Sequence, residues 1–500
     1  MTIQKIKSMM YYVVIAFALS MAGLKQAHAD STTDIVNALV MKGVLTEEEG
    51  ALLTKGHSGE TAAAKKEKDS AVHSAGKMNI RGYLQVRNTA LLGGENSNKG
   101  INLWSDRSVG NVYSMADKDK NIIIRRARVI ISGSAGDRLD YYIQPDFASS
   151  ATGANNVAQL RDYYGDLNLT KDKVHRVRVG QSKVPYGFEN LQSSQNRLAL
   201  DRADAFNSAV RDERDLGAFY YYTPDNVQKL FKEIQDAGLK HSGNYGMFGF
   251  GVYNGQGANQ QDQNSNYHTV ARATYPWKTE SGQIYEAGIQ GYTGKYVRSQ
   301  SAYKRVASQS STPSFTSTYE TKPENGCAAA GCKDERVGIS FMMYPMPFGL
   351  QGEWNWGKSP GLDISQGADV DVSKTDGDQL FSRGRIMNKK LNGGYIQTMY
   401  KIDHVKIGDT DGTVIPFVRW QYFDGYSKAE ANAPQNKVND WELGAEWQIA
   451  PEVELVAYYH HMNRSNLVTG ANSSTTNPSG NADYERFKAD AIRVQLQYNF

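Results

Sequence analysis

The sequence lacks long apolar runs, an excess of either charge, and more than two cysteines. After residue 24 no segment reaches the eighteen or so apolar residues that a transmembrane helix needs, which excludes a helical membrane protein. Basic and acidic residues nearly balance, 56 against 53. A chain with so little net charge predicts no nucleic-acid partner, and any ion preference has to come from where its charges lie.

The first 29 residues predict a secretory signal peptide. Lys5 and Lys7 precede a 16-residue apolar run over 9–24, and Ala27-His28-Ala29 forms a small-x-small triplet before Asp30. The run is too short to span a bilayer comfortably, so a membrane anchor is the weaker alternative. We therefore expect a mature chain that starts at Asp30 and carries no net charge, because the leader removes three lysines and no acid.

What the sequence does contain is period-2 alternation, most clearly in its last nine residues. One face of this segment is apolar and the other polar, with Ile492, Val494, Leu496, Tyr498 and Phe500 opposing Arg493, Gln495, Gln497 and Asn499. Such a strand has one face on an apolar phase and one on water. A terminal aromatic residue is typical of the closing strand of an outer-membrane barrel, in which only every second residue faces lipid. This accounts for a mean hydropathy as low as −0.56.

Sixteen segments read as strands, which predicts an all-β chain forming a 16-stranded antiparallel transmembrane barrel over 79–500. The segments are 79–90, 121–134, 137–147, 158–169, 174–181, 213–222, 244–254, 266–276, 284–295, 334–344, 348–358, 390–402, 414–424, 439–449, 453–463 and 489–500. Short joints alternate with long polar ones, as short periplasmic turns and long extracellular loops require. Residues 223–243 are too long for a periplasmic turn and are assigned a short helix; a strand pair there would make eighteen strands. A soluble β-sandwich would also alternate, but rarely with sixteen strands.

Residues 30–78 differ in pattern and predict a small periplasmic helical extension with a linker. Two short helices are expected, over 36–42 and 47–55, the second opened by the capping-box pair Thr46 and Glu49. The polar stretch 61–70 that follows has no apolar period, and no role is assigned to this region.

The two cysteines lie in Gly-Cys-Ala-Ala-Ala-Gly-Cys, as Cys327 and Cys332. In an exported chain this spacing favours a small loop disulfide. A haem attachment would need Cys-x-x-Cys-His, which is absent, and further ligands for a metal cannot be placed.

Alternation sends several early arginines toward the bore. They are Arg81, Arg87, Arg126, Arg128, Arg176 and Arg178, whereas Arg125 falls on the outer face and is unexplained. Guanidinium groups stay charged and match phosphate or carboxylate oxygens, so an arginine-lined bore predicts a preference for anions. The alternative is indifferent conduction, because acids are also inward candidates: Asp146, Asp162, Asp166, Glu442, Glu446 and Glu454.

The connection 182–212 is the second informative stretch. It carries the cations Lys183, Arg197, Arg202 and Arg211 among apolar residues such as Leu198 and Phe206. Apolar residues are unfavourable on a loop that only contacts water, so we expect this loop to fold into the barrel and constrict it. A lid or a loop at a trimer contact is the alternative.

Four motifs give the chain a family resemblance. They are Ile124-Arg-Arg-Ala-Arg-Val-Ile-Ile-Ser-Gly133, Asp140-Tyr-Tyr-Ile-Gln-Pro-Asp-Phe147, Val179-Gly-Gln-Ser-Lys-Val-Pro-Tyr-Gly-Phe-Glu189 and Arg211-Asp-Glu-Arg-Asp-Leu-Gly217. The chain resembles the phosphate-selective porin O/P family over most of 79–500. The resemblance implies a homotrimeric sixteen-stranded outer-membrane channel that passes phosphate or other anions along arginines and lysines. The residues it assigns by motif are Arg125, Arg126, Arg128, Lys183, Arg197, Arg202, Arg211 and Arg214. A dense lysine cluster at a constriction cannot be placed, since Lys183 is the only lysine of its loop.

The sequence favours no enzyme, metal or cofactor. His460 and His461 are neighbours on a strand, point to opposite faces and cannot jointly bind a metal. The acidic groups at 369–378 and 409–412 fit Asp-Gly turns better than Ca²⁺ loops.

We therefore predict a passive porin in the outer membrane of a Gram-negative bacterium, with small anions such as phosphate as solutes and membrane lipid around it. The alternative is a barrel that sheathes a partner protein, such as an electron-transfer conduit, and a lipid-hydrolysing barrel is a third hypothesis.

Overall fold

The computed structural model describes most of the barrel and a few residues before it. The described residues are 36, 39–42, 46, 49, 52, 78–94, 120–151, 154–298, 302–306, 314–318, 327, 330–363, 380–382, 385–430, 433–468 and 483–500. Two compact units are present, 1–74 and 75–500. The predicted signal peptide, the linker over 61–70 and the acidic group at 369–378 lie outside the described residues.

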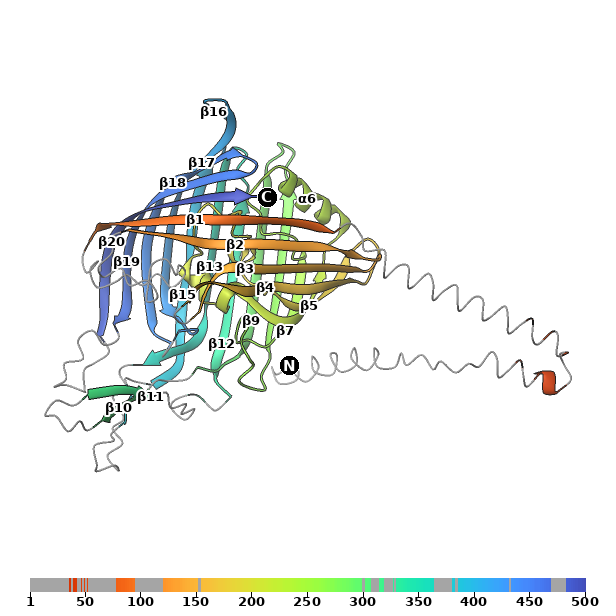
Figure 1. Ribbon diagram of the computed structural model, residues 1–500, viewed down its shortest axis with the longest axis horizontal. Coiled ribbons are helices and arrows are strands. Elements are labelled where there is room, and N and C mark those ends of the chain that lie inside the picture. The colour runs from red at the N-terminus through yellow and green to blue at the C-terminus, as the bar shows by residue number, and fades with distance from the viewer. Residues whose placement is uncertain are drawn as a thin grey trace. The chain divides into compact units, whose positions relative to one another are not determined.

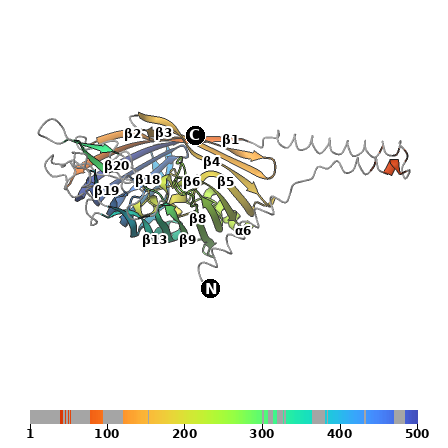
Figure 2. The same ribbon diagram turned by 90° about the horizontal axis from the view of Figure 1, so that it is seen from below.

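Within the described residues, the strands close into a sixteen-stranded antiparallel barrel (Figures 1 and 2). Their strands are β1 Asn79–Gly93, β2 Lys120–Ala135, β3 Leu139–Ala151, β4 Ala154–Asn168, β5 His175–Lys183, β6 Arg214–Tyr222, β7 Phe248–Tyr253, β8 His268–Lys278, β9 Ile284–Tyr296, β12 Cys332–Met343, β13 Phe348–Asp363, β15 Arg385–Tyr400, β16 Ile402–Ile407, β17 Thr410–Tyr426, β18 Gln435–Ala450, β19 Val453–Val468 and β20 Asp483–Asn499. β15 and β16 both pair with β17, so they count as one interrupted strand of the barrel wall. The predicted strand count of sixteen is confirmed, and the alternative of eighteen is wrong.

The barrel closes where β1 pairs with β20. The terminal residue takes part in this closure, because Gly82 N donates to Phe500 O at 2.7 Å and Phe500 N donates to Gly82 O at 3.0 Å. The predicted closing strand therefore joins the two ends of the sheet.

Side chains alternate between the two faces of the wall as the sequence predicts. Outward residues such as Ile80 and Leu443, each 58% exposed, are apolar, while inward residues such as Gln85 and Glu442 are buried. Aromatic residues line both ends of the outer face: Tyr275, Trp277, Tyr285, Phe341, Phe348 and Tyr400 at the end of the short turns, and Trp354, Trp356, Trp420, Tyr422 and Trp441 toward the other end. Such girdles mark the two interfaces of a membrane barrel. Among the described residues, no helix combines the length and apolarity that a bilayer span requires.

The connections alternate in length with two exceptions, a short one between β3 and β4 and a long one between β6 and β7. The predicted segments 137–147 and 158–169 leave a connection over 148–157, but β3 and β4 continue pairing to Ala151 and Ala154, so these two bounds are wrong. The helix expected within 223–243 is present as α6, Asp225–Asp236, at the end of the barrel with the short turns (Figure 1). The opposite end carries a small sheet that the sequence does not predict, made of β10 Ala302–Val306, β11 Ser314–Thr318 and β14 Leu380–Ser382.

The N-terminal unit shows the predicted capping box. Thr46 N donates to Glu49 Oε2 at 2.9 Å, and Glu49 N donates to Thr46 Oγ1 at 3.2 Å. Each side chain thus satisfies a backbone N–H at the start of a helix, which is the reason this residue pair opens helices.

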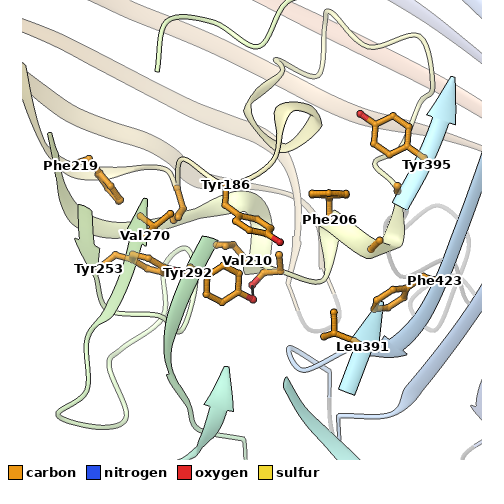
Figure 3. Packing of buried hydrophobic residues seen from close by; sticks show 14 of the residues in the cluster. Tyr186, Phe206, Val210, Phe219, Tyr253, Val270, Tyr292, Leu391, Tyr395 and Phe423 are labelled. Carbon is orange, nitrogen blue, oxygen red and sulfur yellow. Dashed lines mark hydrogen bonds between the residues drawn. The ribbon is translucent and has the colours of Figure 1, made fainter. Parts of the chain in front are cut away.

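Side chains fill much of the bore. The connection 184–213 lies inside the barrel and carries two short helices, α4 Phe188–Leu191 and α5 Asp204–Asn207, and one 3₁₀ turn, η3 Arg211–Glu213. Tyr186 and Phe206 of this loop pack against inner-wall residues such as Tyr292 and Tyr395 (Figure 3). A second cluster joins Leu198 and Leu200 to the apolar face of α6 and to β9, β12, β15, β17 and β19.

The predicted insertion of the loop is therefore confirmed.

Candidate functional site

The loop over 184–210, hereafter the inserted loop, is held by ion pairs to the barrel wall. Its acids each contact inward guanidinium groups: Glu189 with Arg419 at 2.9 Å, Asp201 with Arg87 at 3.0 Å and Arg493 at 2.6 Å, and Asp204 with Arg464 at 3.0 Å. Burial acts to raise the pKa of Asp201, but the guanidiniums of Arg87 and Arg493 overcome this and hold it well below its usual range. These wall arginines therefore anchor the loop.

Backbone groups add further anchors on the other side of the barrel. Glu353 of β13 accepts from the N–H groups of Phe188 at 2.6 Å and Glu189 at 2.8 Å, at the start of α4. Arg336 of β12 donates to Ala205 O at 2.7 Å. The inserted loop is thus tied to strands on several sides of the bore.

A second group of cations lies on β2, β4, β5, β6 and the inserted loop, and each is paired with an acid. The pairs are Arg128 with Asp146 at 2.8 Å, Arg161 with Asp212 at 3.0 Å, Arg178 with Asp166 at 2.7 Å, Arg214 with Asp162 at 2.8 Å, and Arg202 with Glu213. Each pair removes most of the local positive charge. The number of inward arginines alone therefore overstates the positive potential of the bore.

Arg336 is buried without an acid within ion-pair distance among the described residues, but its guanidinium donates to Ala205 and Ser208. Three further buried cations also have no such acid there: Arg126, Lys183 and Arg197. Arg126 donates to the Gln85 amide oxygen at 2.8 Å, and Lys183 donates to two backbone carbonyls at 2.8 and 2.7 Å. Nε and Nη1 of Arg197 have no hydrogen-bond partner in the part of the chain that the structure describes. A buried charge without a counter-charge is costly, so these groups are the ones that an anion would stabilise.

The three cations belong to one electrostatic cluster. Arg126 interacts with Arg197, Arg197 with Arg202, and Lys183 with Arg202. Burial and then the charge of Arg202 lower the pKa of Arg197 to about 9, which leaves it charged at neutral pH. An anion entering this cluster would meet several positive charges and few free acids.

Residual solvent exposure separates this cluster from the loop anchors. The anchoring arginines Arg87, Arg419, Arg464 and Arg493 are 0–1% exposed. Arg126, Arg128, Lys183, Arg197 and Arg202 each keep 4–6%. The cations of the cluster therefore retain slightly more solvent exposure than the arginines that anchor the loop.

A β-bulge explains Arg125, which sequence parity places on the outer face. In the pairing of β1 with β2, Gln85 faces Arg126 and Val86 faces Ile124, so Arg125 is the extra residue. A bulge of this kind interrupts the alternation of side chains between the two faces and re-aims the side chain of the extra residue. Arg125 interacts electrostatically with Arg126 and with Asp201 inside the bore, so the outward placement is wrong.

The other predicted residues lie apart from this cluster. Arg81 is half-buried on β1, and Arg211 is half-buried in η3. Arg176 donates to Asn244 at the end of the barrel that carries the short turns. Cys327 and Cys332 are joined by a disulfide.

The histidines face opposite sides of β19, as predicted. His460 lies 3.1 Å from Asp440 inside the barrel, and His461 lies 2.7 Å from Asp490 on the outer face. Among the described residues, no group of three or more His, Cys, Asp or Glu side chains could hold a metal ion.

Comparison with known families decides the identity of this barrel. The family model described as phosphate-selective porin O and P matches residues 98–500. The chain belongs to this porin family. It is an outer-membrane channel of a Gram-negative bacterium.

Solved structures similar to this porin are outer-membrane proteins. The outer-membrane channel DcaP of Acinetobacter baumannii is 13% identical, with a TM-score of 0.46, over 85% of this chain and 98% of that chain. Salmonella typhi OmpF in complex with daunomycin is 12% identical, with a TM-score of 0.45, over 86% and 99%. An anion-selective porin from Comamonas acidovorans is 12% identical, with a TM-score of 0.43, over 85% and 99%. A comparison with curated proteins gives no match.

Sequence reasoning identified wall acids such as Asp146 and Asp166 but missed the loop acids that neutralise other wall arginines. Glu189, Asp201 and Asp204 are close in sequence to the loop cations, but their partners lie on strands far along the chain. Alternation does send Arg336, Arg419, Arg464 and Arg493 inward, and this signal could have identified them as wall residues.

Proposed function

We propose that this porin passes small anions, phosphate among them, by passive diffusion past Arg126, Lys183 and Arg197. The observation that carries the proposal is that these three cations are buried without a carboxylate, while the other charged groups around them are paired. Fixed positive charges in a narrow route favour anions, and a route without tight coordination allows them to leave.

The decisive measurement is the reversal potential of the purified porin in a planar bilayer under a KCl gradient. We expect the sign of an anion-selective channel, and the cation-selective sign refutes the proposal. Replacing KCl by potassium phosphate then compares phosphate with chloride in the same channel.

The double variant R126A/R197A tests the residues. Each lost charge contributes about 1 kcal/mol to an anion at about 4 Å even in a water-like dielectric, so the anion-to-cation permeability ratio should fall roughly fivefold or more. R138A is the matched control, because Arg138 is an exposed arginine at the rim that donates only to the carbonyls of Asn168 and Leu169. An equal effect of R138A removes Arg126 and Arg197 from the pathway.

The inserted loop favours a channel over a sheath for another protein. It contacts β1, β13, β17, β19 and β20 from inside the barrel and occupies the space that an inserted partner would need. Conduction by the purified barrel alone is the expected result for a channel.

Membership of the family supports a homotrimer as the working form. Chemical cross-linking of the purified protein in detergent tests this, with a ladder that ends at three copies as the expected pattern.

A further inference from the structure

The outer surface of the barrel carries a line of lysines across β9, β12, β13, β15 and β18. We call it the lysine belt; its members are Lys295, Lys333, Lys358, Lys390 and Lys437. Each occupies an outward position of its strand, and all but the half-buried Lys295 are exposed. The belt faces the membrane and is separate from the anion route inside the bore.

Strand register places these lysines beside one another. Lys295 lies directly opposite Lys333, and Lys358 lies directly opposite Lys390. Cβ atoms of such pairs are about 5 Å apart, and like charges in this position repel and destabilise a sheet. Two like-charged lysine pairs in one line should destabilise the barrel wall, so their presence indicates a role other than stability.

The neighbouring acids neutralise only part of this charge. Lys333 pairs with Glu335 at 2.7 Å, and Lys437 lies 3.7 Å from Asp424. Lys295, Lys358 and Lys390 have no acid within ion-pair distance in the described part of the chain. Five lysines therefore face two carboxylates on this surface.

Aromatic residues define the depth of the belt in the membrane. Trp356 and Trp354 precede Lys358 on the same face of β13, and the Trp354 ring stacks with Trp420 at 6.1 Å and with Tyr422 at 6.0 Å. Interfacial tryptophan and tyrosine lie at the level of lipid headgroups. Lys358 is one step farther toward the long connections, which is the extracellular end of such a barrel, so the belt lies among the outer headgroups.

We propose that the lysine belt binds the phosphate groups of an anionic lipid of the outer leaflet. One phosphate bridges Lys358 and Lys390, and a second bridges Lys295 and Lys333. Each bridging phosphate converts a repulsive lysine pair into two charge-assisted hydrogen-bonded contacts. The belt then fixes which lipid surrounds β9 to β18, independently of what the channel conducts.

Lipid retention by the purified porin tests the proposal. The protein is reconstituted in phosphatidylcholine nanodiscs with or without diphosphorylated lipid A, released into detergent, and the retained lipid is measured by native mass spectrometry. A lysine near an anionic surface contributes about 1 kcal/mol, so K358Q/K390Q should lower lipid A affinity roughly thirtyfold. K171Q/K229Q is the matched control, because both lysines are exposed at the opposite end of the barrel, and K358R/K390R should retain the lipid.

Three results overturn the proposal: equal retention by K358Q/K390Q and wild type, equal retention of lipid A stripped of its phosphates, or full displacement of lipid A by inorganic phosphate at the same concentration. The third result assigns the belt to free phosphate. If the double variant does not fold, the single variants K358Q and K390Q decide, each with the same expected direction.

Discussion

At the scale of single residues, the meaning of an arginine in this porin depends on whether it has an acid. Arg178 is held by both oxygens of Asp166 and stacks on the Tyr164 ring, with its guanidinium 3.7 Å from the ring centroid. Arg126 is buried to the same extent, but it donates to the Gln85 amide and forms no ion pair among the described residues. The first is a structural pair, and the second is the unneutralised charge that the anion proposal requires.

This difference predicts opposite effects on stability. Arg178→Ala leaves Asp166 buried without its partner and should lower the free energy of unfolding by about 3–5 kcal/mol. Arg126→Ala exposes no acid and removes repulsion from Arg125 and Arg128, so stability should stay the same or rise. Thermal unfolding of the folded barrel in detergent, followed by circular dichroism, checks both variants. A loss as large for Arg126→Ala as for Arg178→Ala would contradict the assignment.

At the scale of elements, the inserted loop decides how much of the bore is open. Its aromatic residues bury against the wall, and its three acids bind guanidiniums of β1, β17, β19 and β20. Asp201 is central because it contacts arginines of both strands that close the barrel. A folded-state pKa below the unfolded value means that its contribution is fully present above the unfolded carboxyl pKa of about 3.9 and is lost as the pH falls through the folded value.

Replacing Asp201 should loosen this loop. Asp201→Asn removes the carboxylate that Arg87 and Arg493 share, which should cost about 3–5 kcal/mol of stability and raise the single-channel conductance. Thermal unfolding and single-channel recording measure the two effects. Asp236→Asn is the control, since Asp236 forms an exposed pair with Lys232 on α6, and surface pairs contribute little. Unchanged conductance in Asp201→Asn would show that the loop does not set the opening.

At the scale of the whole molecule, the barrel depends on one seam between its first and last strands. Gly82 leaves room there for the terminal ring. A Cβ on Gly82 would lie 2.5 Å from Arg128 O and 2.5 Å from the Phe500 ring, closer than real contacts allow. The backbone oxygen belongs to β2, so the strain would reach three strands.

Gly82→Ala should therefore weaken closure by about 1–3 kcal/mol. The folded fraction is read from the heat-modifiable mobility of the unboiled protein on SDS gels, where the variant should convert to the unfolded band at a lower temperature. Gly352→Ala is the control, because its Cβ would meet Tyr395 O at 3.4 Å, an ordinary contact. Equal behaviour of the two variants would mean that the seam tolerates the added methyl group.

The strands and the helix of this porin follow from local sequence. Alternation over 439–449 and 492–500 is a property of neighbouring residues. A strand places successive side chains on opposite faces regardless of its surroundings, so the pattern can be read from local sequence. The helical pattern near Phe231 and Ile234 is equally local. The bulge at Arg125 is not, because one extra residue opposite β1 leaves no mark on composition or periodicity.

The amino-acid sequence by itself determined which residues face the bore and which face lipid, because strand periodicity depends on nearest neighbours. Only the tertiary structure decided which inward charges are neutralised by an ion pair and which are not. Asp201 neutralises Arg87, 114 positions away, and Arg493, 292 positions away, and these pairs exist because the inserted loop packs between strands that closure brings together. An ion pair depends on distance in space, and no spacing along the chain encodes that distance.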